Sequence, residues 1–167
     1  MIILGIDPGV VSTGYGVLKI KQRQIELIDY GTIKVNSECE LPSRLAGIYK
    51  KMERICVHYR PDALAVEDVF FNRNTKTALA VGHVRGAIML AAAHHGLAVF
   101  TYTPLQIKQA ITGYGRAGKE QVQRMLKIIL KLPELPQPDH AADALAAALC
   151  HYYQGEHQDK NERGEAR

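Results

Sequence analysis

The sequence predicts one α/β domain with a mixed β-sheet and helices on its faces. Two observations predict this class. Segments typical of strands come first, and segments with helical periodicity then alternate with short apolar strands. A chain of 167 residues also has the length of a single domain with one sizeable core. We therefore expect residues 1–153 to form one domain and residues 154–167 to form a polar tail without fixed structure.

Three strands are predicted at the start of the chain. Residues 2–6 are a short apolar run that ends in the turn sequence Asp-Pro-Gly, as a buried strand does. Residues 13–20 and 24–35 are rich in Tyr, Val, Ile and Thr in partly alternating patterns, which predicts two strands joined as a hairpin. From residue 41 to 59 the apolar side chains follow helical spacing, and Pro61 lies just beyond the helix that this predicts.

The rest of the chain alternates strands and helices. The Ala-rich helix ends before Gly96, a typical stop residue, and the short helix after it opens with Pro104. A glycine-rich loop spans residues 113–118. The predicted elements cover residues 63–66 (strand), 77–95 (helix), 97–102 (strand), 104–111 (helix), 119–131 (helix) and 140–153 (helix).

Composition excludes several classes of protein. Hydrophobic residues make up 47% of the chain and charged residues 23%, which excludes bulk disorder and a pure coiled coil. The three cysteines form no CxxC pair, so neither a disulfide framework nor a thiolate zinc site is expected. The first residues do not resemble a signal peptide, and no apolar run approaches the roughly 20 residues that span a bilayer. We expect a cytoplasmic protein without a membrane segment.

Two carboxylates follow predicted strands. Asp7 ends the first strand, and Glu67 ends the strand over residues 63–66. Ligands of α/β folds bind at the carboxyl ends of strands, so both residues are candidates for a site. Each also has a plain structural explanation. Asp7 suits an Asx-turn, and Glu67 suits a charge that emerges from the core into solvent.

A third acidic group opens the last helix. The spacing of Asp139, His140 and Asp143 places all three near one helix face. Asp139 also suits a helix N-cap, and acids in a first turn interact favourably with the helix dipole. No Lys or Arg lies in the apolar segment 140–153, so a bound cation would balance the charge of an inward-facing acid. Oxygen ligands with one imidazole favour Mg²⁺ or Mn²⁺, and such clusters are typical of two-metal phosphodiester hydrolysis.

Basic residues gather in the middle of the chain. Between residues 104 and 131, six basic residues accompany Glu120 alone. This pattern suits a surface that contacts phosphates, although Lys127 and Lys131 suit a solvated helix face better. The glycine-rich loop before Lys119 favours phosphate contact there, because exposed amides and a lysine meet a phosphate together. The candidate phosphate contacts are Arg73, Lys76, Lys108, Arg116 and Lys119.

Two aromatic residues, Phe70 and Phe71, follow Glu67 in a polar loop. Neighbouring side chains of an extended segment point in opposite directions, so one of them suits the core and the other suits solvent. An exposed aromatic beside a metal site can stack on bases or wedge between them.

With these residues assembled, the sequence resembles the RuvC family of crossover (Holliday) junction endodeoxyribonucleases. The resemblance runs in order from residue 1 to about 153 and so covers nearly the whole chain. The segments that carry it are GIDPG at 5–9, TGYG at 13–16, AVEDVF at 65–70, GHVRG at 82–86, PLQIK at 104–108, GYGRAGK at 113–119 and HAADA at 140–144.

The resemblance implies a ribonuclease H-like fold, in which three antiparallel strands are followed by parallel strands and helices cover both faces of the sheet. It implies a homodimer that resolves four-way DNA junctions in recombination and DNA repair. Paired symmetric nicks would leave 5′-phosphate and 3′-hydroxyl ends. It also implies a partnership with the RuvA–RuvB branch-migration complex in the bacterial cytoplasm.

The resemblance further assigns metal ligands. Asp7, Glu67 and Asp143 match the acidic ligands of the family. At the fourth position many members have Asp and some have His, as this chain does at His140. A neutral imidazole binds metal but makes the site less negative by one charge. We interpret Asp139 as a helix cap or as a residue that supports the ligands from behind.

The implied mechanism uses two Mg²⁺ ions per subunit, with Mn²⁺ as a substitute. Asp7 would lie between the ions, with Glu67 on one side and His140 and Asp143 on the other. Lys119 would offset charge in the transition state.

Other residues also match parts of the family pattern. Phe70 matches its junction-stacking aromatic, and Lys108 and Lys119 match its DNA-backbone lysines. The helix around residues 86–93 matches its dimerisation region, although simple packing on the sheet also uses alanines.

Three other classes of function share parts of this pattern. Asp7, Gly9 and Gly14 also resemble the first phosphate loop of actin-like and sugar kinases, but those enzymes need two lobes and 167 residues do not supply them. The acidic residues argue against a protein that only binds junctions, because carboxylates near phosphate would weaken its binding to DNA. A ribonuclease H that acts on RNA–DNA hybrids stays open on the fold alone, while the Phe70 loop and the order of the motifs favour the junction.

Overall fold

The computed structural model describes residues 1–68 and 75–164. Five strands form one sheet in the order β3-β2-β1-β4-β5. β1 pairs antiparallel with β2, and β2 with β3, whereas β1, β4 and β5 run parallel. The elements are β1 (Ile2–Asp7), β2 (Ser12–Lys21), β3 (Gln24–Lys34), α1 (Leu41–Tyr59), β4 (Ala63–Glu67), α2 (Thr75–His94), β5 (Ala98–Tyr102), α3 (Pro104–Thr112), α4 (Lys119–Ile129) and α5 (Asp139–Gly164).

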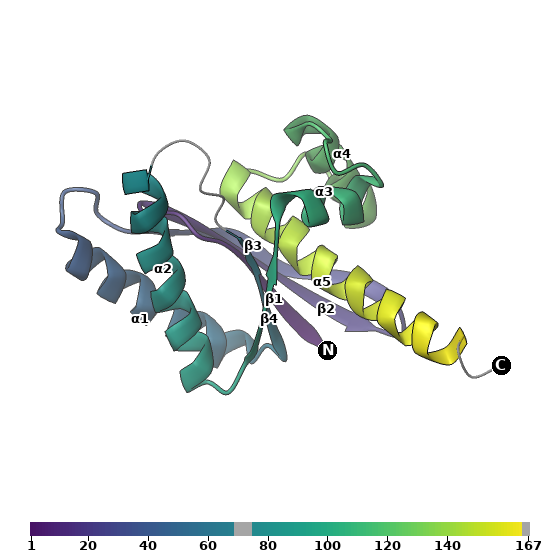
Figure 1. Cartoon of the computed structure of the whole chain (residues 1–167), viewed down its shortest axis with the longest axis horizontal. Helices are drawn as coiled ribbons and strands as arrows, with labels where there is room; N and C mark the ends of the chain where they lie inside the picture. The colour runs from purple at the N-terminus through teal and green to yellow at the C-terminus, as the bar shows by residue number, and fades with distance from the viewer. Residues whose placement is uncertain (69–74, 165–167) are drawn as a thin grey trace.

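Helices cover both faces of this sheet. α1 and α2 lie on one face, and α5 crosses the other with α3 and α4 beside its first turns (Figure 1). Alternate residues of β1 enter two separate cores, with Ile3 on the α5 side and Leu4 and Ile6 on the side of α1 and α2. The mixed sheet, with three antiparallel strands followed by parallel ones and helices on both faces, is therefore confirmed.

Small residues let α5 lie directly on the sheet. A Cβ atom at Gly5 would lie 2.0 Å from the carbonyl oxygen of Ala144, and one at Gly14 would lie 1.8 Å from that of His140. The facing helix surface is rich in buried alanines, so two smooth surfaces meet. Gly14 pairs in register with Asp7. The close approach therefore brings the first turn of α5 next to the end of β1.

Two predicted helix ends differ from the structure. We expect one helix to run to residue 131, but α4 ends at Ile129, and Lys131 has a left-handed backbone with φ 53°. We expect the last helix to end near Tyr153, but α5 continues to Gly164, through most of the tail that we expect to lack fixed structure. The residues beyond Gly155 include Gln, Glu, Lys and Arg, which have high helix propensity, and that outweighs the missing apolar face.

No helix within residues 1–68 and 75–164 is both long enough and apolar enough to span a bilayer. The division into one domain over 1–153 and a tail remains a prediction.

Candidate active site

The sheet brings two candidate carboxylates together. Asp7 and Glu67 end the neighbouring parallel strands β1 and β4, in which Ile6 pairs with Val66. The side chain of Arg85, from α2, forms an ion pair with Asp68 at 2.9 Å and donates to the hydroxyl of Thr101 at 2.8 Å. Arg85 thus ties α2 to the chain directly after Glu67 and to β5.

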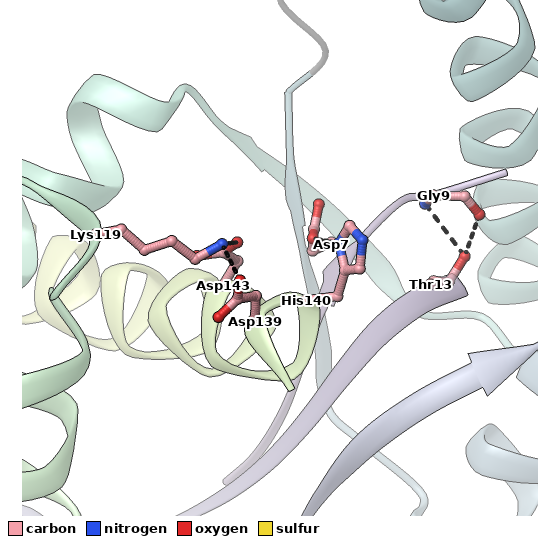
Figure 2. Close-up of polar contacts among 7 residues, drawn as sticks. All are labelled: Asp7, Gly9, Thr13, Lys119, Asp139, His140 and Asp143. Atoms are coloured by element: carbon pink, nitrogen blue, oxygen red, sulfur yellow. Dashed lines mark hydrogen bonds and ion pairs between the residues drawn. The ribbon is translucent and has the colours of Figure 1, made fainter. Parts of the chain in front are cut away.

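The first turn of α5 adds His140 and Asp143 to this edge of the sheet. His140 Nδ1 lies 2.5 Å from Asp7 Oδ2, and Figure 2 shows the imidazole against the Asp7 carboxylate. Burial raises the pKa of Asp7, although the hydrogen bond and the charge of His140 act in the opposite direction. The two residues are 133 positions apart in the sequence, so this contact depends on the close packing of α5 on the sheet.

Burial and neighbouring negative charges make the three carboxylates harder to ionise. Burial raises the pKa of Glu67 to about 8, and the negative charges of Asp7 and Asp143 add to the effect. Burial likewise raises the pKa of Asp143, while the nearby Lys119 charge lowers it. A cluster of half-buried acids that repel one another is stabilised by a bound cation.

Lys119 provides positive charge at this cluster. Its ammonium lies 3.6 Å from Asp143 Oδ2 and 3.1 Å from Asp139 Oδ2. Figure 2 shows the side chain reaching from α4 to the start of α5. Asp139 Oδ1 also accepts a hydrogen bond of 3.0 Å from the side-chain amide of Gln123. The Lys119 bond is the main cause of the lowered pKa of Asp139.

A cavity of about 240 Å³ opens beside the acids, between α3, α4 and α5. Its lining includes two acids, Glu67 and Asp143, and two lysines, Lys108 and Lys119. The charge of Lys108 acts on Glu67, so the lysine lies within electrostatic reach of the carboxylates. A cavity with acids and lysines side by side suits a phosphate that a cation bridges to carboxylates.

The turn between β1 and β2 is fixed by a buried hydroxyl. Thr13 donates to the carbonyl of Gly9 at 2.9 Å and accepts from the amide of Gly9 at 3.3 Å. Figure 2 shows this pair beside Asp7. These two hydrogen bonds therefore fix the turn that directly follows Asp7, the last residue of β1.

The structure brings together Asp7, Glu67, Lys108, Lys119, His140 and Asp143. Arg116 is exposed in the loop between α3 and α4. Phe70 and Arg73 lie outside the described residues, as does the side chain of Lys76, which belongs to α2.

The donor groups fit a hard divalent cation. Three carboxylates and one imidazole are the ligand types that Mg²⁺ and Mn²⁺ accept. Among the described residues, no three acidic, histidine or cysteine side chains are close enough to coordinate one ion as arranged. His140 bonds to Asp7 and Lys119 to Asp143, so these side chains would have to exchange partners for an ion to bind between them.

Sequence reasoning missed two parts of this arrangement. Gln123 is not among the candidate residues of the sequence, but its side chain is 7% exposed and donates a hydrogen bond to Asp139. Gly5 and Gly14 appeared only within motifs, and their role is the close approach of α5. Glycines in strands together with an Ala-rich helix are a signal that could have predicted this packing.

The chain matches known proteins over nearly its whole length. The family model of the crossover junction endodeoxyribonuclease RuvC matches residues 3–151. RuvC of Alkaliphilus metalliredigens is 52% identical over 158 residues, which cover 95% of this chain and 96% of that protein. The solved structure of Thermus thermophilus RuvC has a TM-score of 0.88 at 37% identity, covering 95% of this chain and 97% of that one. The structure of T. thermophilus RuvC in complex with a Holliday junction substrate also has a TM-score of 0.88, at 38% identity, covering 93% and 94%.

Proposed function

Because the chain belongs to the RuvC family of crossover junction endodeoxyribonucleases, we propose that it resolves four-way DNA junctions in recombination and DNA repair by paired symmetric nicks. The observation that carries this proposal is the group of mutually repelling carboxylates beside a cavity lined by two lysines. Such a site serves phosphodiester hydrolysis and serves no purpose in simple DNA binding, because bare carboxylates repel phosphate.

Each residue of the site has a proposed part. Asp7, Glu67, His140 and Asp143 would hold two Mg²⁺ ions, with Mn²⁺ as a substitute. Bound metal of this kind activates water and stabilises the leaving oxygen. Lys119, next to Asp143, would balance the charge that grows on the phosphate as the bond breaks. The products would carry 5′-phosphate and 3′-hydroxyl ends.

The junction would also contact the chain outside the cavity. Lys108 and Arg116 would bind the DNA backbone together with Arg73 and Lys76, and Phe70 would stack on bases. We propose further that the enzyme works in the bacterial cytoplasm with the RuvA–RuvB complex.

Two copies would act together as a homodimer. An exposed stripe on α2 supports this part of the proposal. Its residues recur at four- and three-residue steps, which is the spacing of a helix seam that pairs with another helix. They are Leu79, His83, Gly86, Leu90 and Ala93, all exposed. Two-fold symmetry would give each of two junction strands of like polarity its own site.

The test is cleavage of a mobile synthetic four-way junction in Mg²⁺, beside a linear duplex and an RNA–DNA hybrid. We expect symmetric nicks in the junction alone. Asp7→Asn keeps the shape of the side chain but removes its charge, so it should abolish cleavage, by a factor on the order of 10³ or more, with junction binding retained. Cleavage of the hybrid in preference to the junction would instead indicate a ribonuclease H. Tight junction binding without cleavage in Mg²⁺ or Mn²⁺ would indicate a junction-binding protein without nuclease activity.

A further inference from the structure

Asp139 is held by two side chains of another helix. Its Oδ2 lies 3.1 Å from the Lys119 ammonium, and its Oδ1 accepts a hydrogen bond of 3.0 Å from the Gln123 amide. Lys119 and Gln123 are one turn apart on α4 and therefore face the same way. Both carboxylate oxygens are thus committed to α4.

The Gln123 contact anchors this arrangement. Gln123 is 7% exposed, whereas Asp139 and Lys119 are about half exposed. A buried amide needs a hydrogen-bond partner, and Asp139 supplies one. The carboxylate is therefore fixed at its buried side by Gln123 and presents its other oxygen to Lys119.

Asp139 faces away from the centre of the acid cluster. Figure 2 shows Asp139 beside Lys119, while Asp7 and His140 meet on the other side of the helix start. The neighbouring charges with the largest effects on the pKa of Glu67 are those of Asp7, Asp143, Lys108 and Lys119. Asp139 is one of the main charges that act on Lys119 and Asp143.

We propose that Asp139 is a positioning residue that holds Lys119 at the mouth of the active site and is not itself a metal ligand. This proposal rests on the proposed function. Lys119 has two carboxylate partners, Asp139 and Asp143. If Asp143 bound a cation, Asp139 would remain as the partner that keeps the flexible lysine beside the phosphate. Of the two carboxylates that the described residues place beside Lys119, removal of Asp139 would leave Asp143, which the cation would also need.

The main experiment is a double-mutant cycle under single-turnover conditions with saturating junction. Asp139→Ala should lower the cleavage rate on the order of 10-fold, because a displaced charge stabilises the transition state poorly. Junction affinity should change less than about 2-fold, since a single phosphate contact makes a small part of the total. In a Lys119→Ala background the same change should have almost no effect, since there is no lysine left to position. Gln123→Ala should give a smaller loss in the same direction.

The matched control is Glu120→Ala. Glu120 is an exposed acid on α4 whose partner is Arg124, at 2.6 Å, so its removal changes the net charge equally without touching Lys119. We expect its cleavage rate to equal that of the unmodified protein. An equal loss in Glu120→Ala and Asp139→Ala would assign the effect to overall charge and overturn the proposal.

Two further readouts do not depend on cleavage. Titration with Mn²⁺ should give the same number of bound ions and the same affinity in Asp139→Ala as in the unmodified protein, while Asp143→Asn should bind more weakly. The side-chain mobility of Lys119, measured by NMR relaxation, should rise in Asp139→Ala. Loss of Mn²⁺ binding in Asp139→Ala would make Asp139 a ligand, and unchanged Lys119 mobility would remove its positioning role. If the unmodified protein cuts no junction, the proposed function fails, while the mobility measurement still decides whether Asp139 holds Lys119.

Discussion

At the scale of single residues, the repulsion between half-buried carboxylates is partly offset by neighbouring basic side chains. Glu67 is the most affected group, because burial and the charges of Asp7 and Asp143 all favour its neutral form. His140 and Lys119 offset part of this repulsion through their contacts with Asp7 and Asp143. The free protein therefore keeps its carboxylates partly neutral or paired, and a divalent cation would favour their ionised forms.

This balance predicts a pH dependence of stability in the metal-free protein. The folded pKa of Glu67 is raised from 4.5 to about 8, so its stabilising contribution is complete below about pH 4.5 and is lost as pH rises to about 8. The loss should be on the order of a few kcal/mol in the free energy of unfolding. Urea unfolding in EDTA between pH 5 and 8.5 should show a smaller fall for Glu67→Gln than for the unmodified protein.

The exposed acid Glu134 provides a control, because Glu134→Gln removes a carboxylate that does not line the cavity beside the site acids. Its profile should match that of the unmodified protein. The stabilisation produced by Mg²⁺ should grow over the same pH range, since protons compete for the same oxygens. Parallel profiles for Glu67→Gln and the unmodified protein would show that Glu67 ionises normally in the folded chain.

At the scale of elements, the sequence predicts the strands and helices but not how closely they pack. Periodicity and turn residues predicted every element, because each depends on local spacing. Strand ends and the family resemblance led to Asp7, Glu67 and Asp143. The ion pair of Lys119 with Asp139 and the hydrogen bond from Gln123 to Asp139 were not predictable. They depend on how α4 packs against α5, and no local sequence pattern encodes that contact. The long α5 was missed because its polar continuation has helix propensity without periodicity.

The close packing of α5 predicts a strong effect at Gly14. In Gly14→Ala the new methyl group would meet the His140 carbonyl at 1.8 Å, so α5 must move away from the sheet. We expect a loss of about 3 kcal/mol in the free energy of unfolding. Mn²⁺ binding should also weaken, because His140 and Asp143 move with the helix.

Gly155→Ala is the matched control in α5 itself. Among the described residues, and apart from its chain neighbours and its own helix backbone, no atom lies within 4 Å of a Cβ placed at Gly155. The change should therefore stabilise the helix by about 0.5–1 kcal/mol. Urea unfolding and Mn²⁺ titration of both variants provide the comparison. An unchanged Mn²⁺ affinity in a folded Gly14→Ala protein would show that close packing at Gly14 does not determine the geometry of the metal site.

At the scale of the whole molecule, the two faces of the sheet have different proposed roles. α5 and its neighbours α3 and α4 form the side of the proposed active site, where the acids and lysines meet. α2 lies on the opposite face (Figure 1) and carries the exposed stripe from Leu79 to Ala93. A partner on α2 would therefore leave the cavity between α3, α4 and α5 open to DNA. Under the proposed function, this separation would let the chain pair with a second copy and cut DNA at the same time.

The proposed pairing of α2 with a second copy predicts that one charge on its stripe separates the subunits. Leu90 is 52% exposed, and in Leu90→Lys a two-fold contact would bring the new charge near its own copy. Sedimentation velocity should show a folded monomer, whereas Val57→Lys, at a 62% exposed position on α1, should stay a dimer.

On a supercoiled plasmid with a cruciform, a dimer cuts both strands in one encounter and gives linear DNA. The Leu90→Lys monomer should give nicked circles instead, because its single site must bind twice. A dimeric Leu90→Lys protein that still produces linear DNA would place the partner surface elsewhere than on α2.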